Sequence, residues 1–472
     1  MVARSAGVAS VGRRFLTLGA GEIISRLFAF AATVYLARTL GASVYGVIAA
    51  VTTIMLYLNF IADCGIEMLG VREVAEHPGA LATTLPPILG ARLLIALALM
   101  AVTIPSALWL MPRPDGPVLA LYTVTLVTVA LGTRWVHLGL EQAGNASWAR
   151  IINECVAAAC VLLFVHTPSD LLRVPMAQIL GEVLGAVFLF RLLPIAVRRF
   201  RLELRPGVIT PLLSRSWPLV LHSLLGLAIF NSDFIFLRAM RGSEAVGFYA
   251  ASYTLISFFQ NLGVAYTMSL IPSITRVRND ASAARALIDG SMAQVMALGL
   301  PVMIGGMLVA GPLVSLIFGA GYGPSARPLQ ILLVVIPVAL LRNVAQGVLL
   351  ANERQDLMLH TVAWAAAANV VLNVTLIPFW GMEGAAAATL ATEIARTVLA
   401  LRYARQLGHP MTPIVRFARV GAAATVMGLC VWAVADRPVF ISVPVGGIAY
   451  IGALLAVGAI RLRRGAPPAL NL

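Results

Sequence analysis

The sequence predicts an all-α polytopic membrane protein with about 14 transmembrane helices, in two six-helix bundles that form a parallel pseudo-repeat, plus two C-terminal helices. Composition is the first observation behind this fold class: 60% of the 472 residues are hydrophobic and only 11% are charged. A soluble domain carries about a quarter charged residues. The second observation is a nearly continuous series of long apolar stretches, and the third is an internal repeat.

The apolar stretches are each long enough to cross a bilayer, since a spanning helix needs roughly 20 apolar residues and satisfies its own backbone hydrogen bonds. Glycine and proline in several of the connecting segments indicate where the helices end. The expected spans are 15–37, 44–68, 84–111, 117–140, 147–166, 171–194, 214–239, 246–272, 288–311, 326–350, 357–379, 384–406, 414–435 and 440–460.

The distribution of arginine predicts the orientation. With the N-terminus inside, the inner segments hold about twenty-one Arg and the outer segments about seven, a bias typical of cytoplasmic loops. We therefore interpret the net charge of +14 as a topology signal and expect no nucleic acid partner. The first apolar run is too long for a signal peptide and is expected to remain as a helix. The prediction is a multi-pass membrane protein with both termini in the cytoplasm.

A short motif occurs twice, at a constant offset of 201 residues. The segment from Gly41 to Ala50 matches the segment from Gly242 to Ala251, and Thr53 then matches Thr254. The offset leaves six helices in each copy, so both copies have the same orientation, as in transporters built from two similar bundles. The predicted parts are an N-terminal bundle (1–197), a basic cytoplasmic linker (198–213), a C-terminal bundle (214–406), and two further helices with a cytoplasmic tail (407–472).

Charged side chains inside the expected spans are the candidate binding residues. A charge at the bilayer centre costs about 2.5–3.5 kcal/mol, so arginines retained there are expected to have a function. Two further arginines at span edges, Arg134 and Arg191, are set aside because they can reach the interface. The predicted substrate-binding residues are Arg26, Arg92, Arg342 and Arg396. Arg92 and Arg342 have no acidic residue at pairing distance on their own helix, so we expect each to face an aqueous cavity or a neighbouring helix.

Acidic residues inside the spans are the candidates for ion coupling, because membrane carboxylates can carry protons or cations. They are Glu22, Glu154, Glu182 and Glu393. Glu22 and Glu393 lie one helical turn before Arg26 and Arg396, a spacing that also allows purely structural ion pairs. Asp233 and the pair Asn369 and Asn373 are interpreted as packing residues that form hydrogen bonds.

Motifs of soluble enzymes are not found. The sequence contains no phosphate-binding glycine loop and no His-Glu-x-x-His, and the four cysteines form no Cys-x-x-Cys pair. We predict no catalytic residue, no metal site and no cofactor. The protein is expected to be a transporter and not an enzyme, driven by a gradient or by downstream consumption of its cargo.

Taken together, a set of segments along the chain resembles the polysaccharide-lipid flippases, the polysaccharide transporter branch of the multidrug/oligosaccharidyl-lipid/polysaccharide exporter superfamily. The segments that carry the resemblance are 37–46, 63–67, 71–75, Asp233, 246–251, 271–272, 316–319 with Tyr322 and Ala326, 349–354, Asn369 and Asn373, 377–378, and 381–386. The resemblance implies a V-shaped pair of bundles, alternating access and a central cavity lined by cations.

The cargo that the resemblance implies is an undecaprenyl-diphosphate-linked oligosaccharide for O-antigen, capsule or exopolysaccharide. Arginine suits such a headgroup because it makes bidentate contacts with phosphate. Candidate further partners are a polysaccharide polymerase and chain-length proteins, besides the lipid bilayer. Two alternatives stay open on the same scaffold, a flippase for the peptidoglycan lipid precursor and a multidrug exporter. A membrane glycan polymerase or ligase is a third, disfavoured by the short outer loops.

Overall fold

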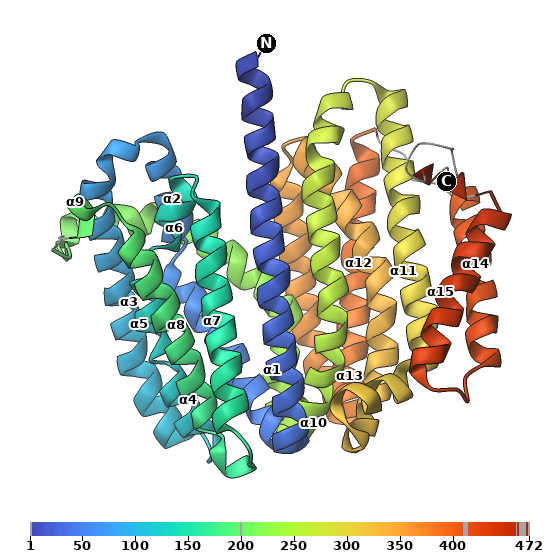
Figure 1. The fold of residues 1–472 in the computed structure, drawn as a ribbon, viewed down its shortest axis with the longest axis horizontal. Helices are drawn as coiled ribbons and strands as arrows, with labels where there is room; N and C mark the ends of the chain where they lie inside the picture. The colour runs from blue at the N-terminus through green and yellow to red at the C-terminus, as the bar shows by residue number, and fades with distance from the viewer. Residues whose placement is uncertain (1, 199–200, 409–413, 459, 462–468, 471–472) are drawn as a thin grey trace. The chain divides into compact units, whose positions relative to one another are not determined.

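The structure is a computed structural model that describes residues 2–198, 201–408, 414–458, 460–461 and 469–470. It is almost entirely helical (Figure 1). The chain divides into two compact units, unit 1 (Met1–Leu224) and unit 2 (Leu225–Leu472). The finer predicted subdivision, with a linker at 198–213 and an end at 406, stays a prediction. Each unit is described by itself.

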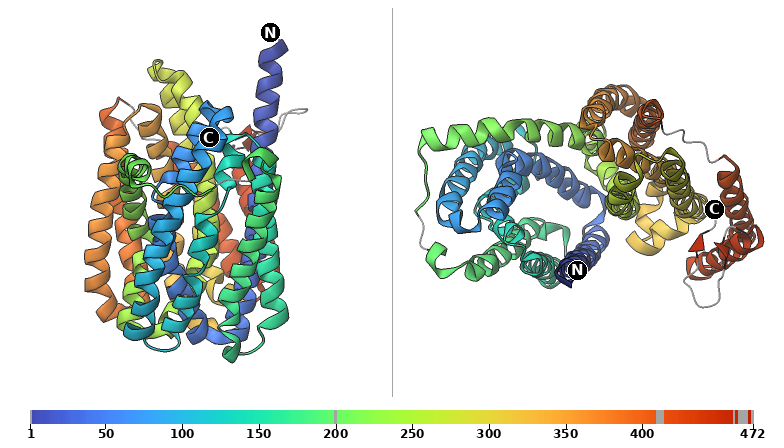
Figure 2. Two further views of the ribbon diagram at one scale, coloured as in Figure 1. Left: turned by 90° about the vertical axis from the view of Figure 1, so that its left-hand side faces the viewer. Right: turned by 90° about the horizontal axis from the view of Figure 1, so that it is seen from above.

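Unit 1 consists of helices that lie side by side, as the view from above in Figure 2 shows. Its elements are α1 (Val2–Asp63), α2 (Ile66–Glu76), η1 (Pro78–Ala80), α3 (Leu81–Leu110), α4 (Asp115–Tyr122), α5 (Thr125–Ala130), α6 (Arg134–Gly139), α7 (Ala143–Phe164), η2 (Pro168–Asp170), α8 (Arg173–Leu192), α9 (Ile195–Arg198) and the first part of α10 (Pro206–Val277).

Unit 2 holds the rest of α10 and the longer helices. They are α11 (Ala281–Phe318), η3 (Ala320–Ser325), α12 (Ala326–Ala351), α13 (Gln355–Gln406), α14 (Ile414–Ala433) and α15 (Val439–Ala456). Near the C-terminus, β1 (Ile460–Arg461) pairs with β2 (Ala469–Leu470) in an antiparallel ladder of two residues per strand. In unit 2, α12 is the most deeply buried of the long helices and packs against α11 and α13.

Ten helices in the described part of the chain are long and apolar enough to cross a membrane. Three of them exceed a single crossing, and each is interrupted at one glycine with a positive φ: Gly41 in α1, Gly242 in α10 and Gly381 in α13. These findings confirm the all-helical, multi-pass class. The expected number of about 14 spans stays a prediction.

The predicted repeat has a counterpart in backbone geometry. Gly41 has φ 76° and ψ 168°, and Gly242, at the offset of 201, has φ 86° and ψ 179°. This region of conformational space is essentially restricted to glycine. In both copies the following threonine, Thr53 or Thr254, donates a hydrogen bond of 2.8 Å to the carbonyl four residues earlier. The two segments therefore form the same turn between two helices.

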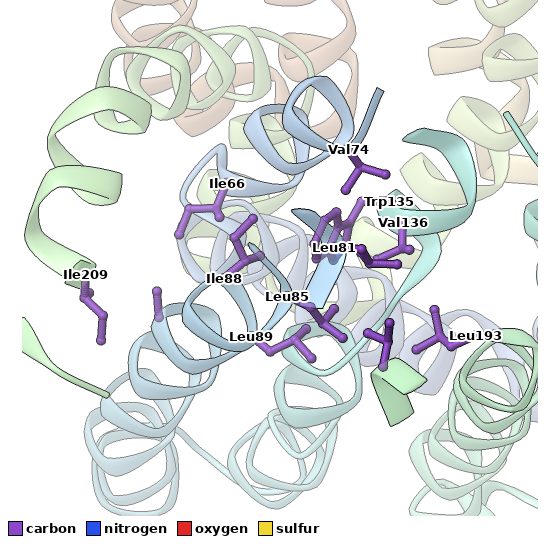
Figure 3. Close-up of a cluster of buried hydrophobic side chains, with 12 residues drawn as sticks. Ile66, Val74, Leu81, Leu85, Ile88, Leu89, Trp135, Val136, Leu193 and Ile209 are labelled. Carbon is purple, nitrogen blue, oxygen red and sulfur yellow. The ribbon is translucent and has the colours of Figure 1, made fainter. Parts of the chain in front are cut away.

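The core of unit 1 gathers around Trp135, whose side chain is fully buried (Figure 3). It draws apolar side chains from α2, α3, α6 and the end of α8: Ile66, Val74, Leu81, Leu85, Ile88, Leu89, Val136 and Leu193. The ring of Trp135 lies so close to Gly70 that a Cβ there would stand 2.6 Å from it. This close packing fixes the short helix α6 against α2, and so positions the break that precedes α6.

Three exposed tryptophans lie near a helix end or at a helix interruption, as expected of side chains at a membrane interface. Trp109 is 88% exposed at the end of α3, Trp432 is 69% exposed at the end of α14, and Trp380 is 61% exposed beside the interruption at Gly381. In the predicted topology all three lie at the side of the membrane that faces away from the cytoplasm.

Candidate functional site

Unit 2 contains a buried charge cluster between α12 and α13, formed by Arg342, Glu393 and Arg396. The guanidinium group of Arg342 donates a very short hydrogen bond to Glu393 and another of 2.6 Å to Gln346 on its own helix. Nη1 of Arg396 lies 3.8 Å from the other carboxylate oxygen of Glu393. The Glu393 side chain is 1% exposed and each arginine side chain 8%. We call this group the arginine cluster.

The arginine cluster carries two guanidinium groups and one carboxylate, and so a net charge of +1. Burying charge is costly unless it is paired and hydrogen-bonded. Glu393 offsets one positive charge, and the excess favours an anion nearby. A guanidinium also offers a planar fork of donors that fits a phosphate. Chemically, the cluster is suited to attract an anionic group.

A second polar group in unit 2 surrounds Asp233 on α10. Its carboxylate accepts a short hydrogen bond from the Tyr249 hydroxyl, one of 3.3 Å from Thr389, and one of 3.0 Å from the backbone N–H of Phe234. Asp233 and Tyr249 are fully buried. These bonds join the two parts of α10 on either side of Gly242 to α13.

Next to Asp233, a chain of neutral hydrogen bonds continues into α13. Asn373 donates to Asn369 over 2.8 Å, and Ser232 donates to the same Asn369 oxygen over 3.0 Å. Asn369 donates to Thr392 over 3.4 Å. The prediction that Asp233, Asn369 and Asn373 form packing hydrogen bonds is therefore confirmed.

In unit 1, Arg92 on α3 is also buried, with a side chain 3% exposed, but its surroundings differ. Its Nη2 donates to the Val129 carbonyl over 2.9 Å and its Nη1 to the Gly132 carbonyl over 3.4 Å. The same Nη2 lies 3.3 Å from Asp63 and 3.9 Å from Glu67. Arg92 thus faces neighbouring helices, one of the two environments expected for it.

The carbonyls that Arg92 binds belong to a break in a membrane-spanning segment. Between Ala130, where α5 ends, and Arg134, where α6 begins, the chain leaves the helical hydrogen-bonding pattern. The last carbonyls of a helix have no partner within the helix, and the end of the helix carries a partial negative charge. The guanidinium of Arg92 satisfies both requirements, so its contacts stabilise the broken helix.

The remaining predicted residues of unit 1 do not form one site with Arg92. Glu182 on α8 is partly buried and accepts from Thr128 over 2.6 Å and from Gln178 over 3.5 Å. Glu154 lies on α7, also partly buried. The Arg26 side chain on α1 is exposed, and the side chain of Glu22 lies outside the described residues.

Sequence reasoning missed the hydrogen-bonding partners that link helices. It considered Glu393 only with Arg396 on its own helix, whereas Glu393 also binds Arg342 across from α12. Tyr249 was part of the repeated motif but received no role, although a tyrosine in an otherwise apolar span is a signal for a buried hydrogen bond. Ser232 and Thr389 carried no signal in the sequence.

Comparison with known proteins assigns the chain to a family. The profile of the polysaccharide biosynthesis protein family matches residues 11–278, more than half of the chain. The chain belongs to this family. A curated relative, "Probable flippase AglR" of Haloferax volcanii, is 26% identical over 208 residues, which are 41% of this chain and 43% of the relative. The match therefore spans less than half of that relative's length.

Solved structures share the fold. The "Lipid II flippase MurJ, inward closed conformation" has a TM-score of 0.79 at 12% identity, over 93% of this chain and 98% of its own. An inward-facing multidrug resistance MATE transporter of the MOP superfamily has a TM-score of 0.65 at 13% identity, over 84% and 95% of the two chains. The curated relative and the two solved structures are thus named as flippases or transporters. At these identities the likeness shows the fold alone.

Proposed function

We propose that this protein is a flippase that moves an undecaprenyl-diphosphate-linked oligosaccharide across the bacterial inner membrane by alternating access, for synthesis of a surface polysaccharide. Three findings support the proposal: the family, the flippase named among its relatives, and the fold it shares with flippases and exporters. The observation that carries it is the excess positive charge of the arginine cluster inside a membrane-spanning bundle.

The proposed cargo explains why charge is kept there. A diphosphate loses its hydration when it enters the membrane, and arginine can replace that hydration with bidentate, charge-assisted hydrogen bonds. The polyprenyl chain can stay in lipid while the headgroup crosses. Arg342 and Arg396 are the proposed headgroup contacts in unit 2. Arg26 and Arg92 remain proposed contacts in unit 1, although the carbonyl bonds of Arg92 favour a structural role.

Transport by the purified protein in proteoliposomes tests the proposal. The substrate is a fluorescent undecaprenyl-diphosphate oligosaccharide, and the readout is its accessibility on the opposite leaflet. We expect R396A and R342A to lower the transport rate by about tenfold or more, equivalent to about 1.4 kcal/mol per factor of ten. The matched control is R354A, since Arg354 is 42% exposed and pairs with Asp356 at the surface. Wild-type transport by both cluster variants, at equal protein level, would remove the cluster from the mechanism.

Ion coupling is proposed for the acidic residues of the expected spans. Glu393 binds the arginines directly, so its protonation or its release by an arriving anion would change the charge of the cluster. Glu182, Glu154 and Glu22 are the corresponding candidates in unit 1. Measuring transport with and without an imposed proton or sodium gradient, in wild type and E182Q, tests this role. A rate independent of both gradients would contradict it.

A second candidate function is transport of the peptidoglycan lipid precursor, which the close fold similarity to a Lipid II flippase favours. That cargo is also a polyprenyl diphosphate, so the arginine cluster suits it equally. Rescue of a strain depleted of its own Lipid II flippase separates the two, because a dedicated polysaccharide flippase is expected to fail there. A multidrug exporter of cationic compounds is disfavoured by the sign of the cluster.

A further inference from the structure

Two adjoining cavities open between the second part of α10 and the first part of α11, and the smaller one also reaches Leu340 on α12. One measures about 360 Å³ and contains the side chains of Ser269, Ser273 and Ser291. The other measures about 250 Å³. Both are lined by Tyr266 and Gln294, so the two cavities meet at this pair of residues, and we call them together the groove. Its size is that of a small-molecule site.

The groove changes character along its length. Its first part contains the three serines, and its second part is lined by Leu262, Val295, Leu298 and Leu340. Tyr266 and Gln294 lie at the junction. Among the described residues that line either part, none is charged. The groove therefore offers hydroxyl and amide groups at one end and hydrocarbon at the other.

The polar groups at the junction are pre-arranged. The Tyr266 hydroxyl donates to the Gln294 side-chain oxygen over 2.7 Å, which fixes the amide and turns its N–H₂ toward other acceptors. Within the described part of the chain, that N–H₂ group and the Ser273 hydroxyl make no hydrogen bond, so both are available to a ligand. Tyrosine also presents a flat apolar face beside its hydroxyl.

The depth of the two parts matches the depth profile of a lipid. The turn between α10 and α11 lies at residues 278–280. At 1.5 Å per helical residue, Ser273 is about 6 Å from the end of α10 and Leu262 about 22 Å. The hydrocarbon core is about 30 Å thick, so the polar part lies near one interface and the apolar part near the midplane. A membrane lipid has the same arrangement, with a polar headgroup near the interface and the first part of its acyl chain closer to the midplane.

The floor of the groove is closely packed and requires glycine. A Cβ on Gly263 would lie 2.5 Å from the Asn343 amide nitrogen and 2.7 Å from Leu340. The backbone of α10 therefore rests directly on α12 beneath the apolar part. The close packing of α10 on α12 therefore defines the floor of the groove.

We propose that this groove binds one neutral glycolipid, with the sugar at Ser273, Tyr266 and Gln294 and the first part of the chain along Leu262, Val295 and Leu298. Uncharged hydroxyl and amide groups suit sugar hydroxyls, and the tyrosine ring suits the apolar face of a sugar. An anionic phospholipid would find no cation in the groove. Arg285, which directly precedes the lining residue Ala286, is not among the lining residues and lies 3.8 Å from Asp289. The site is separate from the proposed headgroup contacts and does not depend on the transported cargo.

Lipid retention by the full chain tests the proposal. The protein is placed in phosphatidylglycerol nanodiscs containing a few mole per cent of monoglucosyl-diacylglycerol or, in a parallel sample, diacylglycerol. Native mass spectrometry then counts the lipids that stay bound after release. We expect one glucosyl lipid on the wild type, and about tenfold lower occupancy in the double variant Y266F/Q294L, which loses two hydrogen-bonding groups. L298W should lower occupancy of the same lipid by filling the apolar part.

The matched control is Q330L, which removes an amide from α12 that donates to the Met307 carbonyl away from the groove. It should retain the glucosyl lipid like the wild type. Thermal unfolding of each variant shows whether the bundle is intact. Equal retention of diacylglycerol and glucosyl lipid, preferential retention of phosphatidylglycerol, or wild-type occupancy in folded Y266F/Q294L and L298W would each overturn the proposal.

Discussion

Units 1 and 2 each bury an arginine in a membrane-spanning bundle, but they neutralise it differently. Arg92 binds backbone carbonyls that a helix break exposes, with two acids nearby whose side chains are 23% and 33% exposed. Arg342 binds Glu393, which is 1% exposed and shared with Arg396. The helices related by the offset of 201 residues differ too. The segment that contains α4, α5 and α6 is divided into three short helices, whereas its counterpart α12 is one continuous helix.

The surroundings of these buried arginines also differ in net charge. Arg92, Asp63 and Glu67 together carry an excess of one negative charge, and within the described part of the chain Nε of Arg92 and Oδ1 of Asp63 make no hydrogen bond. The arginine cluster carries an excess of one positive charge. Two bundles that share a repeated turn have thus diverged in the polar groups they enclose, and the burial of an arginine is not by itself a sign of a binding site.

Replacing Glu393 is expected to have the largest effect on stability. E393L leaves two guanidinium groups buried without their shared carboxylate, which costs about 3–5 kcal/mol. D63L in unit 1 should cost much less, because Arg92 keeps its carbonyl partners. Thermal unfolding in detergent measures both. A loss for D63L equal to that for E393L would contradict the difference between the units.

Replacing Arg92 comes next. R92L removes the charged donor shared by the Val129 and Gly132 carbonyls, although Val129 keeps a backbone bond of 3.1 Å from Gly132. We expect a loss of about 1.5–3 kcal/mol, the range for hydrogen bonds to charged groups. Hydrogen exchange should increase around residues 130–134, where α5 ends and α6 begins, and should stay unchanged in α12. An unaltered exchange pattern would show that Arg92 does not hold the break.

The repeated turn gives a third test. G41A and G242A each place a Cβ in a backbone region that only glycine tolerates, at a cost of about 1–3 kcal/mol, and the two costs should be similar. The control is G311A, within α11 and free of close neighbours, which should be neutral or slightly stabilising. Unequal costs at the two turns, measured by unfolding, would weaken the repeat as a structural equivalence.

The smallest expected effect on stability concerns the N-terminal caps of α11 and α3. Asp280 caps α11 by accepting from the backbone N–H groups of Ser282 and Ala283, whereas Ala80, the N-cap residue of α3, provides no side-chain cap. The Ala283 hydrogen bond is the main cause that lowers the pKa of Asp280. A lowered pKa stabilises the fold above the unfolded-state value of about 4, and this contribution disappears as the pH falls through the folded-state pKa.

We therefore expect D280A to destabilise unit 2 slightly at neutral pH, and D280N to keep the cap while removing its pH dependence. Unfolding between pH 3 and pH 7 measures both. A D280N variant with the pH dependence of the wild type would show that another group is responsible.

Much of this architecture follows from the sequence because the bilayer imposes strong rules. Apolar length predicts the helices, and the matched glycines at an offset of 201 predict the turn that Gly41 and Gly242 adopt. The break between α5 and α6 was not predicted, since residues 117–131 hold no charged residue and no proline after Pro117, and Gly132 and Arg134 were not interpreted as a helix break. Pairing between helices was also inaccessible, because Glu393 and Arg342 are 51 residues apart and only packing brings them together.

The tryptophans at the helix ends have a spectroscopic consequence. Trp109, Trp380 and Trp432 expose most of their indole surface, in contrast to the enclosed Trp135. Lipids brominated close to the glycerol backbone should quench the emission of the exposed indoles, whereas bromine at the methyl end of the acyl chain should affect them little. The quenching of tryptophan fluorescence therefore reports how deeply these helix ends lie in a bilayer of chosen thickness.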